Sequence, residues 1–217
     1  MSILIPEPTP YDVNFRLLDF PIRVHPGFWV VHFGIAGFLA NDTNIAETLN
    51  PVIVFLISFI CTSGSILLHE LGHVLAGRKF GADGEVVLTF LGGFAGTGIE
   101  AHGRKHRILT ILAGPAMNVL LVAVAAAGYE ASQPSVEEII SAYRSDPNAP
   151  LTKLGFGRSL VEQFTLMLLC INIPLVLFNL LPIPPLDGGL VLQEIVEWYR
   201  FGDRPEWERD ANWWKRG

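Results

Sequence analysis

The chain has 217 residues, of which half are hydrophobic and 17% are charged, and its formal net charge is −6 at pH 7. Soluble domains have about 25% charged residues, so these numbers leave a membrane protein or a very apolar soluble one. The acidic balance argues against a nucleic-acid partner, which needs a basic surface. The two cysteines lie far apart in apolar runs, which argues against a disulfide scaffold.

Four apolar runs predict membrane-spanning helices, because a bilayer core about 30 Å thick needs roughly 20 apolar residues of helix. A fifth apolar segment, residues 188–196, is too short to span and carries Glu194. We expect it to be re-entrant or interfacial. The predicted fold class is therefore mainly α, a polytopic membrane helix bundle with about four spanning helices. The four runs cover residues 28–40, 51–68 (continuing to 77), 108–128 and 164–181.

Two smaller elements lie between these runs. Residues 85–91 have the composition of a strand, Gly92 and Gly93 supply a turn, and Phe94 begins a return strand. This small β-hairpin should pack over a site, because irregular backbone beside a membrane needs protein or a water-filled cavity to cover it. In the loop after residue 128, Ser135 and Glu138 have the spacing of a capping box and predict a short helix.

The distribution of basic residues predicts the topology. With the N-terminus inside, 12 of the 15 basic residues fall on the inner side, as the positive-inside rule requires. We therefore expect a multi-pass protein of the cell membrane with both termini cytoplasmic. The expected organisation is a single membrane-embedded domain, 1–217, with an N-terminal segment (1–27), a membrane core (28–196) and a cytoplasmic tail (197–217).

The strongest chemical signal is His69-Glu70-Leu-Gly-His73, at the inner end of the second predicted span. Residues four apart share one face of a helix, so both imidazoles can reach one metal ion. Zn²⁺ fits best, and Glu70, one step round the helix, can activate a water as general base. The alternative is a polar helix end with packed or solvated histidines. Ionisable groups that continue a hydrophobic span are costly, which favours the functional interpretation.

A catalytic zinc site needs a third protein ligand. Candidates are the other histidines and a carboxylate, of which Asp187 is the strongest. It follows the fourth predicted span on the same side of the membrane as the histidine motif, after prolines that must end the helix. The alternative is that Asp187 only caps the next helix. The other histidines, to which no role is assigned, are His25, His32, His102 and His106.

Two asparagines in apolar runs have two interpretations each. Asn118 lies in the third predicted span, after Gly114-Pro115, and Asn179 lies near the end of the fourth. Either side chain could make an interhelical hydrogen bond. Either could instead donate to the oxyanion that forms during peptide hydrolysis, or position the substrate.

The three motifs together resemble those of the site-2 protease family of intramembrane zinc metalloproteases. They are the HExxH sequence, Gly114-Pro-x-x-Asn118, and Asn179-x-x-Pro182-x-x-x-Leu186-Asp187-Gly188. The resemblance implies that His69, His73 and Asp187 bind one Zn²⁺ per chain, with Glu70 as the general base. It also implies a membrane-associated hairpin at residues 84–98, and cleavage of membrane-anchored regulatory proteins in or near their transmembrane helices. An exposed edge of the 85–91 strand could hold the unwound substrate by strand addition.

Two other classes of function stay open. One is a catalytically inactive module that binds membrane helices, although the intact Glu70 argues against it. The other is a metal-ion transporter, for which we would expect repeated halves that the sequence does not show. Zinc content, turnover and zinc flux distinguish the three classes.

Overall fold

A computed structural model describes residues 6–41, 50–98, 103–147 and 160–202. Most of these residues are helical, which confirms the mainly α class. The helices are α1 (Pro26–Ala40), α3 (Pro51–Lys79), α4 (Arg104–Ser132), α5 (Val136–Ser145), α6 (Leu160–Asn179) and α7 (Asp187–Phe201). The strands are β1 (Val13–Leu17), β2 (Phe20–Val24), β3 (Glu85–Thr89) and β4 (Gly92–Gly96).

Three helices, α3, α4 and α6, are long and apolar enough to cross a membrane. They correspond to three of the four predicted runs. Helices α3 and α4 extend past their runs into polar residues, whereas α6 ends at Asn179, two residues before the end of its run. The fourth run forms α1, which has 15 residues. At 1.5 Å per residue α1 is about 22 Å long, shorter than a bilayer core of about 30 Å. A fourth span therefore stays a prediction.

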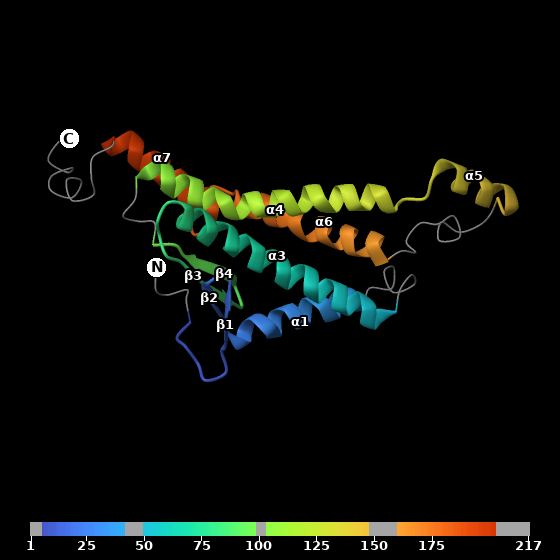
Figure 1. The fold of residues 1–217 in the computed structure, drawn as a ribbon, viewed down its shortest axis with the longest axis horizontal. Helices are drawn as coiled ribbons and strands as arrows, with labels where there is room; N and C mark the ends of the chain where they lie inside the picture. Colours follow the sequence, from blue (N-terminus) through green and yellow to red (C-terminus); the bar gives the residue numbers. More distant parts are fainter. Residues whose placement is uncertain (1–5, 42–49, 99–102, 148–159, 203–217) are drawn as a thin grey trace.

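The three long helices lie side by side, with α1 against α3 on one flank (Figure 1). Stacked aromatic rings join α1 to α3, with the ring centroids of Phe33 and Phe59 4.7 Å apart. On the other side, α3 and α4 approach closely at Gly72. A Cβ atom there would collide with the carbonyl oxygen of Ala113 and the side chain of Met117. Small residues allow such close backbone contact between membrane helices.

The strands form one four-stranded sheet in the order β1-β2-β3-β4. The predicted hairpin is confirmed as β3 and β4, which pair antiparallel. The N-terminal hairpin β1–β2 is not predicted, and β2 pairs parallel with β3 through Ile22–Val24. Because β3 is thus internal, the prediction that the 85–91 strand has an exposed edge is wrong. In this hairpin the strand with a free edge is β4, which lies at the end of the sheet.

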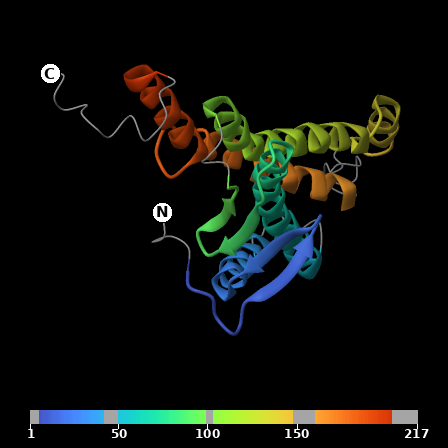
Figure 2. The ribbon, with the colours of Figure 1, turned by 60° about the vertical axis from the view of Figure 1, so that its left-hand side comes forward.

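The sheet is fixed against the histidine-bearing half of α3 (Figure 2). Its inward side chains are almost fully buried, and each contributes about 1.5–3 kcal/mol of hydrophobic stabilisation. On α3 they meet Leu71 and Val74, which flank His73. The sheet is therefore held directly beside the motif. The inward side chains are Phe20, Ile22, Val24, Val86 and Leu88.

The segment after α6 returns tightly onto the start of α7. Helix α6 ends at Asn179, before the prolines, and α7 begins at Asp187. A Cβ atom at Gly188 would collide with the carbonyl of Leu180, and one at Gly189 with the backbone of Ile183. The segment predicted as re-entrant or interfacial forms the regular helix α7. Asp187 is its first helical residue, and the capping position belongs to Leu186.

Candidate metal centre

Three predicted ligands, two from α3 and one from α7, meet at one point. His69 Nε2 lies 3.1 Å from Asp187 Oδ2, and His73 Nε2 lies 3.5 Å from Asp187 Oδ1. The two Nε2 atoms are 3.1 Å apart. All three residues are buried, with exposed fractions of 6%, 7% and 9%. The structure thus brings together the residues that the sequence motifs single out, although 114 positions separate His73 from Asp187.

Hydrogen bonds behind the two imidazoles fix their tautomers. His73 Nδ1 lies 2.9 Å from the carbonyl oxygen of Thr110, which can only accept. His73 Nδ1 must therefore carry the proton. His69 Nδ1 faces the side-chain oxygen of Asn118, so this nitrogen also donates. In neutral imidazoles both Nε2 atoms then present lone pairs toward Asp187.

This donor set fits a zinc ion. With both imidazoles neutral and protonated on Nδ1, two nitrogen lone pairs and a carboxylate converge, and Asp187 Oδ2 accepts no hydrogen bond from the described residues. Such a group repels itself unless a cation lies among its members. Ligand atoms about 2.0 Å from a tetrahedral Zn²⁺ lie about 3.3 Å from one another. The two Nε2 atoms are 3.1 Å apart, and they lie 3.1 and 3.5 Å from different oxygens of Asp187. One ligand atom from each residue lies within 4.8 Å of the other two. Outer partners on both Nδ1 atoms are also typical of zinc-binding histidines.

One face of α4 forms the wall behind the histidines. Thr110, Gly114 and Asn118 are spaced four residues apart, which places them along one stripe of the helix. Thr110 and Asn118 bond the two imidazoles. At Gly114, between them, a Cβ atom would collide with His73 Nε2 and crowd His69 Nε2. The glycine is therefore required to keep the metal position open.

Glu70 lies between the metal centre and the sheet. Its side chain is buried, with 6% exposed, and it contacts β4 at Gly93. A Cβ atom on Gly93 would collide with Cγ of Glu70. The free edge strand of the sheet thus lies directly against the carboxyl group that the sequence predicts as general base.

Of the two interpretations of Asn118, the structure shows the interhelical hydrogen bond. The side-chain oxygen of Asn118 accepts a hydrogen bond from His69 Nδ1. Its Nδ2 donates to Asn172 Oδ1 at 2.7 Å and to the Ser65 carbonyl at 3.4 Å. Asn118 therefore orients a histidine and has no free donor for an oxyanion. Asn179 is the last residue of α6 and is half-buried. Asn172 is fully buried on α6 and is not predicted from the sequence. The signal that could have indicated it is the presence of a polar residue within an apolar run.

The alternative third ligands lie elsewhere. His25 caps α1 by accepting from Gly27 N at 3.1 Å, and His32 stacks on Phe28 with ring centroids 3.9 Å apart. His106 stacks on Phe80. His102 lies outside the described residues. Within the described ranges, the group with metal-binding geometry consists of His69, His73 and Asp187.

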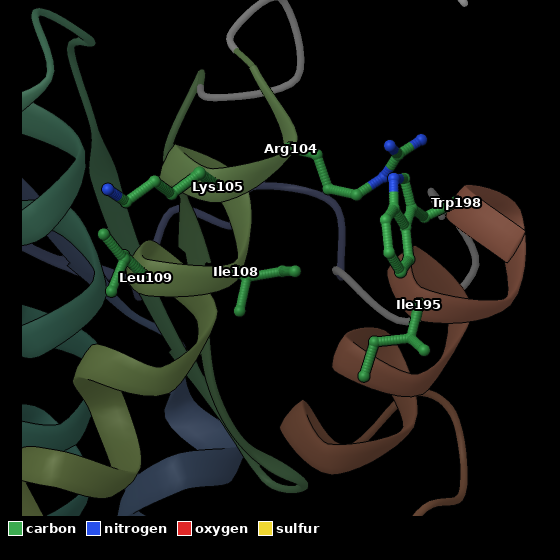
Figure 3. Close-up of a pocket in the computed structure, with 6 residues that line it drawn as sticks. All are labelled: Arg104, Lys105, Ile108, Leu109, Ile195 and Trp198. Atoms are coloured by element: carbon green, nitrogen blue, oxygen red, sulfur yellow. The ribbon is translucent and has the colours of Figure 1, made fainter. Parts of the chain in front are cut away.

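A separate cavity of about 340 Å³ opens between α4 and α7 (Figure 3). Ile108 of α4 and Ile195 of α7 point into the space between the helices. The cavity does not include the metal ligands, so we do not assign it to the site. Its lining residues are Arg104, Lys105, Ile108, Leu109, Ile195 and Trp198.

Comparison with known proteins agrees with this geometry. Residues 55–216 match Peptidase family M50. Over 87% of its length the chain is 29% identical to Rip3 of Mycobacterium tuberculosis, and over 83% it is 30% identical to a protein of Synechocystis. Both are provisionally named zinc metalloproteases. The chain spans 44% and 42% of their respective lengths.

The fold also resembles a solved structure. The site-2 protease from Methanocaldococcus jannaschii superposes with a TM-score of 0.53 and 22% identity. The match covers 88% of this chain and 74% of that one.

Proposed function

Because the chain belongs to peptidase family M50, we propose that it is an intramembrane zinc metalloprotease. Its substrates would be membrane-anchored regulatory proteins, cut within or near a transmembrane helix. The observation that carries this proposal is the convergence of two imidazole nitrogens and one carboxylate beside a buried glutamate. Three ligands and an open fourth position are typical of catalytic zinc sites.

Each residue of the centre has a proposed role. His69, His73 and Asp187 would hold one Zn²⁺, which supplies Lewis-acid polarisation of a water and of the scissile carbonyl when bound. Glu70 takes a proton from the attacking water and returns it to the leaving amine. Thr110 and Asn118 hold the imidazoles in the correct tautomer. Asn179, at the end of α6, remains the candidate for positioning the substrate.

We propose that the substrate binds along the free edge of β4. A helical substrate must unwind before cleavage, because its carbonyls are engaged in its own hydrogen bonds. An extended segment can then pair with an exposed strand edge. Strand β4 offers such an edge and contacts Glu70 through Gly93, so a strand bound there would pass the proposed general base.

We retain the predicted topology as part of the proposal. The single domain, 1–217, would have cytoplasmic segments at 1–27 and 197–217 around a membrane core in the cell membrane. The ends of α3 and α4 nearest the sheet carry Arg78, Lys79 and Arg104, which supports a cytoplasmic location for the sheet and the metal centre. Reagents added to sealed vesicles should modify a cysteine placed at Asp83 only from the cytoplasmic side.

The decisive experiment is Glu70→Gln in purified protein with a single-span test protein as substrate. The variant should bind about one zinc per chain, because the three ligands remain, while cleavage falls by about a hundredfold or more. Asp187→Ala should lose both zinc and cleavage. Glu137→Gln, on the exposed face of α5, serves as the control. Wild-type cleavage by Glu70→Gln would disprove the assigned role.

Measurements on the purified wild-type chain distinguish the other two possible functions. A wild-type chain that binds zinc but cuts no substrate would be an inactive helix-binding module. Zinc flux into liposomes without proteolysis would indicate a transporter.

A further inference from the structure

Asn172 is a fully buried amide in the middle of the apolar helix α6. A buried amide without hydrogen bonds is costly, so its bonding should be complete. Its Nδ2 lies 2.9 Å from the carbonyl oxygen of Leu168 and 2.9 Å from Ser65 Oγ. A backbone carbonyl can only accept. The amide group that faces Leu168 must therefore be the NH₂, and the opposite orientation of Asn172 is excluded.

This fixed orientation determines the next amide in the cluster. Since the NH₂ of Asn172 faces Leu168, its oxygen faces Asn118, 2.7 Å away. That oxygen can only accept, so the NH₂ of Asn118 must face it. The oxygen of Asn118 is consequently directed at Nδ1 of His69. The proton of His69 is placed on Nδ1, and the lone pair is left on Nε2 at the metal position.

The two histidines differ in the kind of group that accepts a hydrogen bond from Nδ1. His73 is oriented by the backbone carbonyl of Thr110, which cannot reverse its polarity. His69 is oriented by a side-chain amide, which can flip and present a donor where an acceptor is required. Among the described residues, the flip is opposed by the 2.7 Å contact to Asn172 and by the longer, 3.4 Å contact to the Ser65 carbonyl. A flipped Asn118 would favour the tautomer of His69 with its proton on Nε2, and the protonated Nε2 atom could not bind a metal at this position.

From this chain of contacts we infer that Asn172 is a positioning residue for the metal centre. It fixes the orientation of the Asn118 amide and thereby keeps the metal-binding nitrogen of His69 unprotonated. The amide relay (Asn172 and Asn118) runs from α6 through α4 to α3 and has no direct contact with the metal position. This inference rests on the proposed zinc site.

The test measures zinc affinity by chelator competition in the purified full chain, independently of proteolysis. Asn172→Leu has a similar volume but offers no acceptor to Asn118, so zinc should bind about ten- to a hundredfold more weakly. Thr165→Val is the matched control, because Thr165 is also buried on α6 and its hydroxyl donates within its own helix, to the carbonyls of Val161 and Glu162. This control should bind zinc as the wild type does.

A double variant separates positioning from a general loss of packing. If Asn172 acts through Asn118, Asn118→Leu with Asn172→Leu should bind zinc no more weakly than Asn118→Leu alone. Additive losses would show that Asn172 acts by another route and would overturn the inference, as would unchanged affinity in Asn172→Leu. If the wild type bound no zinc, the proposed function itself would fail, which is a different result.

Discussion

Glu194 of α7 accepts two hydrogen bonds from Arg107 of α4, each 2.7 Å long. Both side chains are largely buried. Glu194 lies seven residues after Asp187, two turns along the same face of α7, and Arg107 lies one turn before Thr110 on α4. The ion pair therefore fixes the helix that carries the third ligand to the helix that orients the histidines.

Glu194→Gln tests this connection. Loss of the charge leaves Arg107 in a largely buried position with a weaker partner, which should destabilise the fold by about 1.5–3 kcal/mol. Because α7 positions Asp187, the apparent zinc affinity should fall as well. Thermal unfolding with zinc and with a chelator measures both effects. A variant with lower stability but unchanged zinc affinity would show that the loop before α7 alone positions Asp187.

Gly114→Ala should remove the metal without removing the fold. The added methyl group would occupy the space beside both Nε2 atoms. In a helix, alanine is otherwise favoured over glycine by about 1 kcal/mol, so the bundle should persist. Metal analysis and circular dichroism of the purified variant check the two expectations. Gly64→Ala on α3, where a Cβ atom meets no neighbour, is the control. Normal zinc content in Gly114→Ala would contradict the assigned geometry.

The N-terminal hairpin should lose stability in acid through Asp12. The side-chain hydrogen bond from Thr9, together with Arg23, lowers the pKa of the Asp12 carboxyl below its ordinary value of 3.8. A lowered pKa in the folded state contributes stability above pH 3.8, and this contribution is lost as the pH falls through the folded pKa. Wild-type protein should therefore melt at a higher temperature than Asp12→Asn at neutral pH. The difference should disappear in acid, and a constant difference would contradict the shift.

Sequence patterns over a few residues predict the features of this molecule that depend on neighbours in the chain. The spacing of His69 and His73 fixes both on one helix face, and the capping box of α5 is present with both of its hydrogen bonds. Hydropathy finds the centres of α3, α4 and α6. It does not find their ends, because polar residues such as Arg104 and Arg107 continue α4 outside the apolar run.

The remaining features depend on contacts between distant segments. Pro21 interrupts the strand pattern of residues 20–24, since proline lacks the N–H that a ladder requires. The structure tolerates it because the parallel pairing with β3 begins only at Ile22. The role of Asn172 follows from partners on two other helices, which no spacing along α6 reveals. The internal position of β3 likewise depends on β2, more than 60 residues earlier.

Gly93→Ala should separate metal binding from catalysis. The added Cβ atom would collide with the side chain of Glu70, so it should displace this carboxyl group or the β4 backbone. The zinc ligands lie on α3 and α7 and have no part in this contact. We therefore expect zinc content to remain normal while kcat falls by about a hundredfold, as for loss of a general base. Single-turnover cleavage of a single-span test protein, with metal analysis of the same sample, measures both quantities.

Gly96→Ala provides the matched control for this strand. Its Cβ atom would lie 3.3 Å from Cγ of the exposed Glu85 side chain, which can move aside. Stability and zinc content should stay normal in this variant, so a loss of kcat confined to Gly93→Ala cannot come from a damaged sheet. If both variants lost kcat equally while zinc stayed bound, the effect would belong to β4 as a whole. The contact between Gly93 and Glu70 would then have no special part in catalysis.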